Sequence, residues 1–354
     1  MIVNDISATT RVTKPFVSVL IPCRNEGKFI DACLTSVMHN GYPLERLEVL
    51  VIDGISSDNT RSTLSLWSAR HGCIRLIDNP RRITPCALNV GIAAASGEVI
   101  IRLDAHATYE PDYITRCVEA LNLGNVGSSG GVWNVKPRTE SPVAQAIACC
   151  MSHRFGGAAR YRRTSGSEPE TANVVPFFCC KRETLAAVGR FNEALVRHQD
   201  YEYNARMRRA GYRCVLVPRA VCNYYTRSDL KSFAAHSFRD GLWVTFSMAF
   251  TDTLPLTLRH AVPMVFTGAL LTGAIAAEFW SAARWSVLVQ IVMYLIITII
   301  CAVRVAVQRR DSRMLLWMPV LFGCRHVLFG VGGILGLARV YTSKLASRTV
   351  NSRQ

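Results

Sequence analysis

Short apolar runs alternate with amphipathic stretches over the first two-thirds of the chain. Residues 17–21, 47–52 and 99–103 are runs rich in Val, Ile and Leu, and runs of this kind predict buried strands. Between them, 29–38 and 60–69 have the spacing of amphipathic helices. Short strands that alternate with helices predict an α/β fold with a mainly parallel sheet.

Long uncharged segments replace this alternation in the last third. Residues 261–277 carry no charge, and 285–303 are 19 residues without one, which is enough to cross a bilayer. Residues 314–338 are also apolar, but Arg325 and His326 interrupt them. A charge at mid-bilayer is costly unless it is paired or hydrated. The last segment therefore predicts a single span, a hairpin that turns at Arg325-His326, or an element in the membrane interface.

These patterns divide the chain into consecutive parts. We predict an N-terminal tail at 1–15, an α/β domain at 16–230, interfacial helices at 231–260, a transmembrane region at 261–340 and a basic tail at 341–354. A chain of 354 residues is long enough for one large domain with such an appendage.

Charge and cysteine usage restrict the partners and the compartment. The net charge of +16 suits nucleic acid, anionic lipid or a polyanionic substrate. The basic residues form no stripe interleaved with aromatics, so we predict no nucleic-acid partner. Thirteen cysteines without metal-ligand spacing predict reduced thiols in the cytosol. Residues 1–16 contain no apolar run, which predicts that no secretory signal exports the α/β domain.

The arginines predict the membrane topology. Residues 304–313 carry four arginines, and the positive-inside rule places such a short loop in the cytoplasm. Two spans, 261–280 and 285–303, would then leave the cytoplasm and return. The basic residues after 338 favour a cytoplasmic C-terminus, which requires that 314–338 adds no full crossing.

Three aspartates stand where a ligand site is expected. Asp53 and Asp104 end strand-like runs, and Asp200 precedes a helical stretch. Ligands of such sheets bind beyond the carboxyl ends of the strands, although aspartate also favours these places for turn chemistry. Asp104 and His106 stand two residues apart, and a carboxylate with an imidazole suits Mn²⁺ or a similar cation. The alternative is a turn aspartate beside a surface histidine.

The order of motifs resembles the family 2 glycosyltransferases of the GT-A fold. The matching stretches cover about residues 16–218 and are VSVLIPCRNE at 17–26, VIDGISSDNT at 51–60, ALNVGI at 87–92, ASGEVIIRLDAH at 95–106, VGRFNE at 188–193 and QDYEYNARMRRAG at 199–211. The Asp-Ala-His variant and the apolar tail are most similar to the succinoglycan-type exopolysaccharide branch, which elongates a lipid-linked sugar.

The resemblance implies a donor site at the start of the chain. Pro22, Asn25 and Glu26 would line the nucleotide pocket. Asp53 would accept a hydrogen bond from the uracil N3–H of a UDP-sugar. Asp104 would contact the ribose.

The resemblance also implies a cation and a general base. Asp104 and His106 would hold a divalent cation, Mn²⁺ or Mg²⁺, with His106 in the place of a second aspartate. Asp200 would take the proton from the acceptor hydroxyl as it attacks the anomeric carbon. Ile52 and Gln199 depart from the family pattern, since both stand where many members have an acid.

The processive branch carries a Gln-x-x-Arg-Trp motif after the catalytic domain, and its nearest match here is 236–240 with Trp243 further on. This departure favours the addition of one or a few sugars. The sequence as a whole therefore predicts an inverting transferase on the cytoplasmic face of the plasma membrane, anchored by several spans. Its acceptor would be a saccharide on a polyprenyl carrier. One alternative is transfer directly to polyprenyl phosphate, and another is a non-catalytic membrane scaffold.

Overall fold

The computed structural model describes residues 14–157, 166–251 and 258–351, with the backbone alone from residue 343 onward. The predicted tail at 1–15 therefore lies almost wholly outside the described residues. The side chains of the predicted basic tail at 341–354 lie outside them from residue 343 onward.

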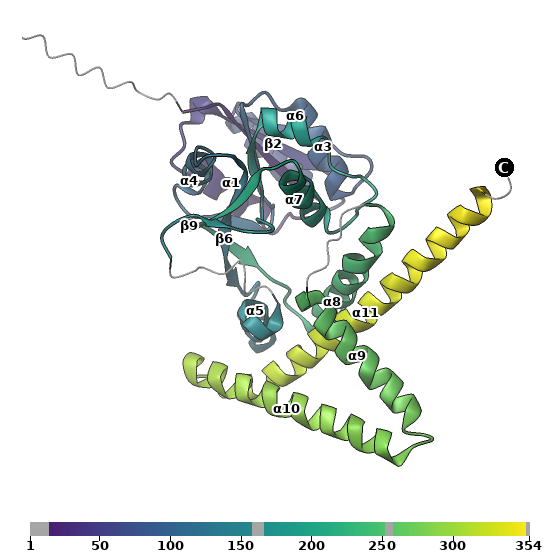
Figure 1. Ribbon diagram of the computed structural model, residues 1–354. Helices are drawn as coiled ribbons and strands as arrows, with labels where there is room; N and C mark the ends of the chain where they lie inside the picture. Colours follow the sequence, from purple (N-terminus) through teal and green to yellow (C-terminus); the bar gives the residue numbers. More distant parts are fainter. Residues whose placement is uncertain (1–13, 158–165, 252–257, 352–354) are drawn as a thin grey trace, which may run out of the picture.

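A twisted sheet with helices on both faces forms the N-terminal domain (Figure 1). Its first half contains four parallel strands in the spatial order β3-β2-β1-β4. The strands are β1 Val17–Cys23, β2 Leu47–Asp53, β3 Ile74–Asp78 and β4 Val99–Arg102, and the helices are α1 Ile30–Met38, α2 Thr60–Arg70 and α3 Thr84–Ala94. The strands and helices expected in this half are confirmed, with bounds that differ by one or two residues.

Beyond β4 the sheet becomes mixed. β8 pairs antiparallel with β4 and β6, whereas β9 runs parallel to β6 and antiparallel to β5 and β7. The remaining elements of the domain are β5 Ala107–Tyr109, α4 Tyr113–Ala120, β6 Val126–Lys136, α5 Pro142–Ser152, β7 Glu170–Thr171, β8 Cys179–Lys181, α6 Arg182–Val188, α7 Gln199–Arg209 and β9 Arg213–Tyr225. The predicted α/β class is confirmed, and the sheet is wholly parallel only among β1 to β4.

Side chains alternate along the central strands to fill two cores. On β1, Val19 and Ile21 belong to the core beneath α1 and α4, whereas Leu20 belongs to the core beneath α3 and α7. All thirteen cysteines are free thiols, as expected. Because both faces of the central strands are covered, a ligand reaches these strands at their ends.

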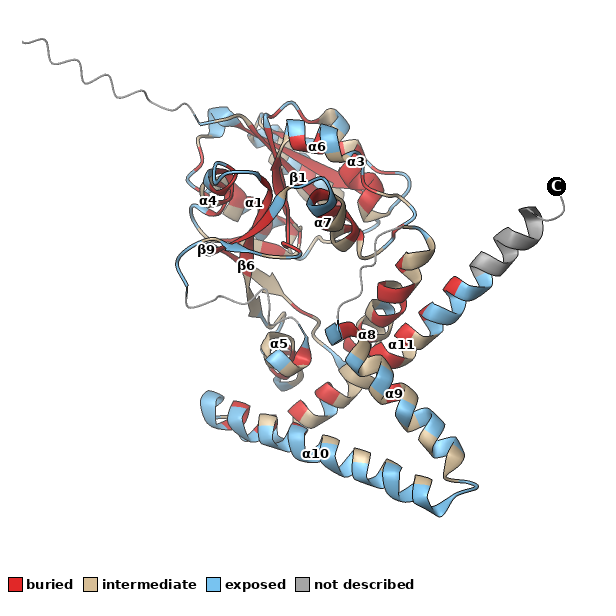
Figure 2. Cartoon of the chain, viewed as in Figure 1, coloured by how far each residue is buried: buried red, intermediate tan, exposed pale blue. Residues whose placement is uncertain are grey.

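Three long helices follow α8, which spans Leu230–Phe246. They are α9 Leu258–Ala276, α10 Ser281–Arg309 and α11 Met314–Asn351. All three are long and apolar enough to cross a membrane, but 39% of the apolar window of α11 is buried inside the protein, against 11% for α9 and α10. Figure 2 shows that α10 is exposed along most of its length. The two helices α9 and α10 thus turn apolar side chains outward.

The helix α11 continues without a break through Arg325 and His326, so the predicted hairpin at these residues is wrong. Glycines explain why α11 packs on the domain instead. A Cβ on Gly332 would lie 2.2 Å from the carbonyl oxygen of Phe238, and one on Gly241 would lie 2.0 Å from that of Phe329. The backbones of α8 and α11 therefore approach more closely than other residues would allow.

Candidate active site

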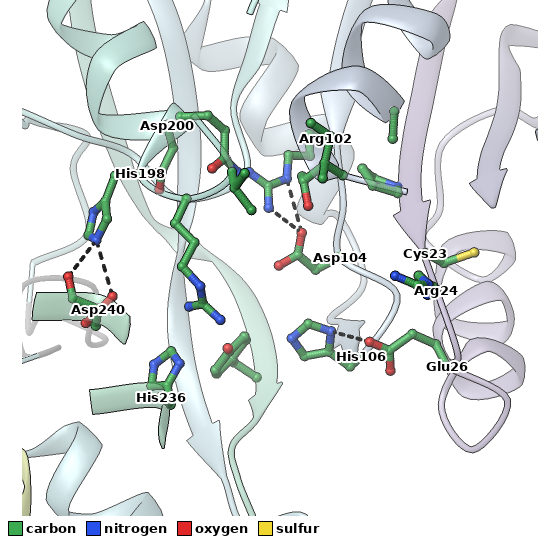
Figure 3. Close-up of a pocket in the computed structure, with 18 of the residues that line it drawn as sticks. Cys23, Arg24, Glu26, Arg102, Asp104, His106, His198, Asp200, His236 and Asp240 are labelled. Carbon is green, nitrogen blue, oxygen red and sulfur yellow. Dashed lines mark hydrogen bonds and ion pairs between the residues drawn. The ribbon is translucent and has the colours of Figure 1, made fainter. Parts of the chain in front are cut away.

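A cavity of about 540 Å³ opens at the carboxyl ends of β1 and β4 and extends to α7, α8 and α11 (Figure 3). Five of the predicted site residues line it, from three separate segments of the chain: Pro22, Glu26, Asp104, His106 and Asp200. The fold therefore brings together motifs that lie far apart in the sequence. The role of each residue remains a prediction.

Asp104 follows β4 and is held by a guanidinium two residues earlier. Arg102 donates to Asp104 Oδ1 from Nε at 3.1 Å and from Nη2 at 2.8 Å. Tyr109 also fixes the turn, because its hydroxyl oxygen accepts from the Asp104 N–H at 2.6 Å. Burial works against the charge of Arg102, but Asp104 and Asp200 raise its pKa above the usual value. Arg102 thus links the two carboxylates electrostatically.

His106 faces the turn after β1. Its Nδ1 lies 3.2 Å from Oε1 of Glu26, and its ring packs edge-on against Tyr224 (Figure 3). Asp104, His106 and Glu26 thus supply two carboxylates and an imidazole to one cavity.

These donors suit a cation that arrives with phosphate. In the described part of the chain, no three His, Cys, Asp or Glu side chains gather closely enough to hold an ion by themselves. Mg²⁺ is commonly bound by one or two carboxylates together with substrate phosphates, and Mn²⁺ accepts carboxylate and imidazole donors. The pair Asp104 and His106 therefore fits a cation completed by a diphosphate, not a closed structural site.

Asp200 is the second residue of α7, where free backbone N–H groups favour a carboxylate. The helix is fixed to the preceding turn, since the Tyr203 hydroxyl donates to the Gly189 carbonyl at 2.9 Å. The rings of Phe191 and Tyr203 stack with centroids 4.0 Å apart. The Val-Gly-Arg-Phe-Asn-Glu motif thus positions the start of α7 and with it Asp200.

Two predicted residues lie beside the cavity without lining it. Asp53 has a side chain with no exposed surface, and it accepts hydrogen bonds from Ser56 and Arg61. Burial alone would raise the pKa of Asp53, but these hydrogen bonds hold it below its usual value. Asn25 adopts a φ of 56°, and its Oδ1 accepts from the Ser57 N–H at 2.8 Å. Asn25 joins the loop after β1 to the loop after β2, whereas Asp53 holds the loop after β2 to the start of α2. The predicted contacts of both residues with the nucleotide remain predictions.

More arginines line the cavity than the sequence motifs predicted. Six of them lie along it, against four carboxylates: Arg24, Arg82, Arg102, Arg197, Arg227 and Arg325. Arg82, in the loop after β3, lies at the cavity, whereas Arg239 of α8 does not. Arg24 and Arg197 stand inside or beside the quoted motifs, which is the signal that could have found them.

Asp240 of α8 connects three elements at the lower edge of the cavity. Its Oδ2 accepts from Arg325 Nη2 of α11 at 2.6 Å, and its Oδ1 lies 3.4 Å from Nε2 of His198, which precedes α7. Burial would raise the pKa of Asp240, but Arg325 and His198 hold it well below the usual value. The neighbouring His236 is half-buried, and desolvation lowers its pKa to about 4. Arg325, which interrupts the last apolar segment, is therefore paired with a charge on α8.

Comparison with known proteins indicates the family of the chain. Residues 18–180 match the family model described as Glycosyl transferase family 2. Together with the α/β fold and the relatives described next, this match supports a family 2 glycosyltransferase and an enzyme of that kind. The expected family is confirmed, and the non-catalytic scaffold is set aside.

Two curated relatives match most of their own length. The succinoglycan biosynthesis protein ExoA of Rhizobium meliloti (strain 1021) is 28% identical over 287 residues, which are 75% of this chain and 82% of that protein. The dolichyl N-acetyl-alpha-D-glucosaminyl phosphate 3-beta-D-2,3-diacetamido-2,3-dideoxy-beta-D-glucuronosyltransferase of Methanococcus voltae is 27% identical over 234 residues, 64% of this chain and 72% of that protein.

A solved structure matches nearly the whole chain. It is the mannosyltransferase PcManGT from Pyrobaculum calidifontis in complex with GDP-Man and Mn²⁺, with a TM-score of 0.62 and 21% identity. The match covers 91% of this chain and 88% of that one. This likeness confirms the predicted GT-A fold.

Proposed function

We propose that the chain transfers a sugar from a nucleotide-diphosphate donor, such as a UDP-sugar, to a lipid-linked saccharide in cell-envelope or exopolysaccharide synthesis. The observation that carries the proposal is one cavity in which Asp104, His106 and Asp200 lie among six arginines. Guanidinium groups bind diphosphate oxygens in a fixed geometry, and a carboxylate can serve as a base. The names of the two curated relatives, which refer to a dolichyl phosphate saccharide and to succinoglycan, support the acceptor class.

The donor half of the cavity is the end formed by β1 and β4. Pro22, Glu26 and Asp104 line it, and we assign them to the nucleotide, with Asn25 and Asp53 shaping the loops behind. Asp104 and His106 would hold Mn²⁺ or Mg²⁺, an assignment that the Mn²⁺ of the mannosyltransferase structure supports. Such a cation neutralises negative charge on the departing nucleotide diphosphate.

Asp200 is the proposed base. It takes the proton of the acceptor hydroxyl while that oxygen forms a bond to the anomeric carbon and the bond to the diphosphate breaks. Attack opposite the leaving group in one displacement inverts the anomeric configuration. Arg102 also lines the cavity, and its positive charge interacts with both Asp104 and Asp200.

The location follows from the helices and the substrates. Nucleotide sugars are cytoplasmic, so we place the catalytic domain on the inner face of the plasma membrane with α9 and α10 as spans. Helices with exposed apolar faces suit this role. The net charge of +16 would hold the domain close to anionic lipid.

A donor panel tests the proposal. Membrane fractions that contain the full chain are incubated with UDP- and GDP-sugars, and with either a polyprenyl diphosphate saccharide or polyprenyl phosphate. We expect transfer from one donor to the lipid-linked saccharide, with an inverted linkage by NMR. Transfer to polyprenyl phosphate alone would instead support the alternative acceptor, and a retained linkage would rule out the single displacement.

A further inference from the structure

A second cavity adjoins the catalytic one on the side of the long helices. It has a volume of about 650 Å³ and lies between α9, α10, α11 and the turn at 154–157, within the range of about 300–1,000 Å³ that suits small-molecule sites. Five residues line both cavities: Gly157, His198, Tyr201, Asp240 and Arg325. A molecule in the second cavity can therefore extend into the first.

Most of the wall is apolar. It consists of side chains from the turn and from all three helices, namely Phe155, Val262, Pro263, Phe266, Met293, Ile297 and Phe329. The outer faces of the same helices are apolar and exposed, for example Val265 on α9 and Ile300 on α10. The cavity thus lies within the part of the protein that would contact lipid, and a hydrocarbon chain fits its wall.

The end beside the catalytic cavity is positively charged. Arg154, Arg259 and Arg325 line the second cavity, and its one acid is Asp240, which already pairs with Arg325. The other guanidinium nitrogen of Arg325, Nη1, is buried and has no hydrogen-bond partner among the described residues. A buried donor without a partner is costly, so this atom indicates an acceptor oxygen that the ligand brings.

We propose that the second cavity binds a single-chain lipid phosphate, the membrane-embedded part of the sugar acceptor. The chain lies against the apolar wall, and the phosphate lies at Arg325 with Arg154 and Arg259 at the mouth. The saccharide on the phosphate then points into the catalytic cavity toward Asp200. This inference rests on the proposed function, because it assigns a site to the acceptor that the function requires.

The direct test is equilibrium binding of labelled farnesyl phosphate to the full-length protein in nanodiscs. We expect farnesol, which lacks the phosphate, and inorganic phosphate, which lacks the chain, to compete at least about tenfold more weakly, because each loses one half of the contacts. Farnesol that competes equally would reduce the site to an apolar pocket. Inorganic phosphate that competes equally would reduce it to an anion site, and either result overturns the proposal.

Variants locate the ligand. Met293→Trp places a larger side chain in the apolar cavity and is expected to weaken farnesyl phosphate binding at least about tenfold, whereas Ile300→Trp, on the same helix but not lining the cavity, leaves it unchanged. Arg259→Gln removes an exposed charge at the mouth and should also weaken binding. Arg325→Gln should weaken it most, but it removes the arginine partner of Asp240. If this variant does not fold, Met293→Trp and Arg259→Gln decide. Wild-type affinity in both Met293→Trp and Arg259→Gln would overturn the assignment.

Lipid binding tests the inference and sugar transfer tests the proposed function, so the two can fail separately. If no lipid-linked saccharide accepts sugar from any donor, the proposed function is rejected, while the farnesyl phosphate measurement still decides the inference. If the wild type transfers sugar and Met293→Trp transfers equally well at limiting acceptor concentration, the function stands and the acceptor lies elsewhere.

Discussion

Contacts of the residues next to Asp200 in the sequence fix the position of its carboxylate. The helix that begins at Gln199 is tied to the preceding turn by Tyr203, and the residue before the helix, His198, is tied to Asp240. If Asp200 is the base, as proposed, it is already held in place before an acceptor binds. The carboxylate is thus fixed from both ends of the turn that presents it.

Asp200→Asn is expected to lower the rate of transfer by roughly 10²–10⁴, the usual contribution of a general base. Nucleotide binding should change little, because the residue lies at the acceptor end of the cavity. Single-turnover transfer and nucleotide titration measure the two effects. Glu183→Gln, which removes an exposed acid on α6, serves as the control. Near-normal turnover of the Asp200 variant would reject the assignment.

His106→Ala is expected to weaken activation by Mn²⁺, because Asp104 would then be the one remaining predicted ligand. The measurement is the transfer rate against Mn²⁺ and Mg²⁺ concentration, after treatment with a chelator. His39→Ala changes an exposed histidine at the end of α1 and should behave as wild type. Full activity of the wild type in excess chelator would show that the reaction needs no cation.

Site residues could be predicted where their position depends on neighbours in the sequence. Residues whose partners lie far away along the chain were missed. Asp104 and His106 follow a strand directly, so their place at the cavity could be inferred. Arg325 was interpreted as a disruption of an apolar segment, because its partner Asp240 is 85 residues away. Asp53 was correctly predicted to end a strand. The sequence did not show that its carboxylate accepts hydrogen bonds from Ser56 and Arg61.

At the scale of elements, glycines determine how the membrane helices meet the catalytic domain. Residues 330–336 contain four glycines and still lie inside one helix. Gly332 faces α8, and Gly330 lies against α9, where a Cβ would be 2.5 Å from the carbonyl oxygen of Pro263. Strand and helix periods in the first half were predictable because they depend on local burial. The close packing of α11 was not, because it depends on which surfaces meet.

Gly332→Ala is expected to destabilise the protein by about 1–3 kcal/mol, because the added methyl group overpacks the contact with α8. Gly323→Ala, on the same helix with no atom within 4 Å of its Cβ position, should be neutral or stabilise by up to about 1 kcal/mol through helix propensity. Unfolding of both variants in detergent measures the difference. Equal unfolding midpoints would contradict the close contact of α8 and α11.

At the scale of the whole molecule, α11 crosses α8 and α9, and its C-terminal turns extend away from the sheet domain (Figure 1). Its start packs with α5 and the end of α10, through Met314, Met318 and Ala306. Its middle pairs with Asp240, and its later turns pack on α8. We therefore expect the loop between α10 and α11 to lie on the same side of the membrane as the catalytic domain. The helices α9 and α10 both extend away from the domain (Figure 1), and we expect this pair to cross the membrane out and back.

This arrangement predicts two crossings and a cytoplasmic C-terminus, with α11 in the interface. A green fluorescent protein fused after Gln354 should fluoresce, whereas alkaline phosphatase at the same place should be inactive, since it folds only outside the cytoplasm. A phosphatase fused after Trp280, in the turn between α9 and α10, should be active. Phosphatase activity after Gln354 would mean that α11 crosses the membrane. That crossing would separate Arg325 from Asp240, so the same result would also contradict the ion pair between them.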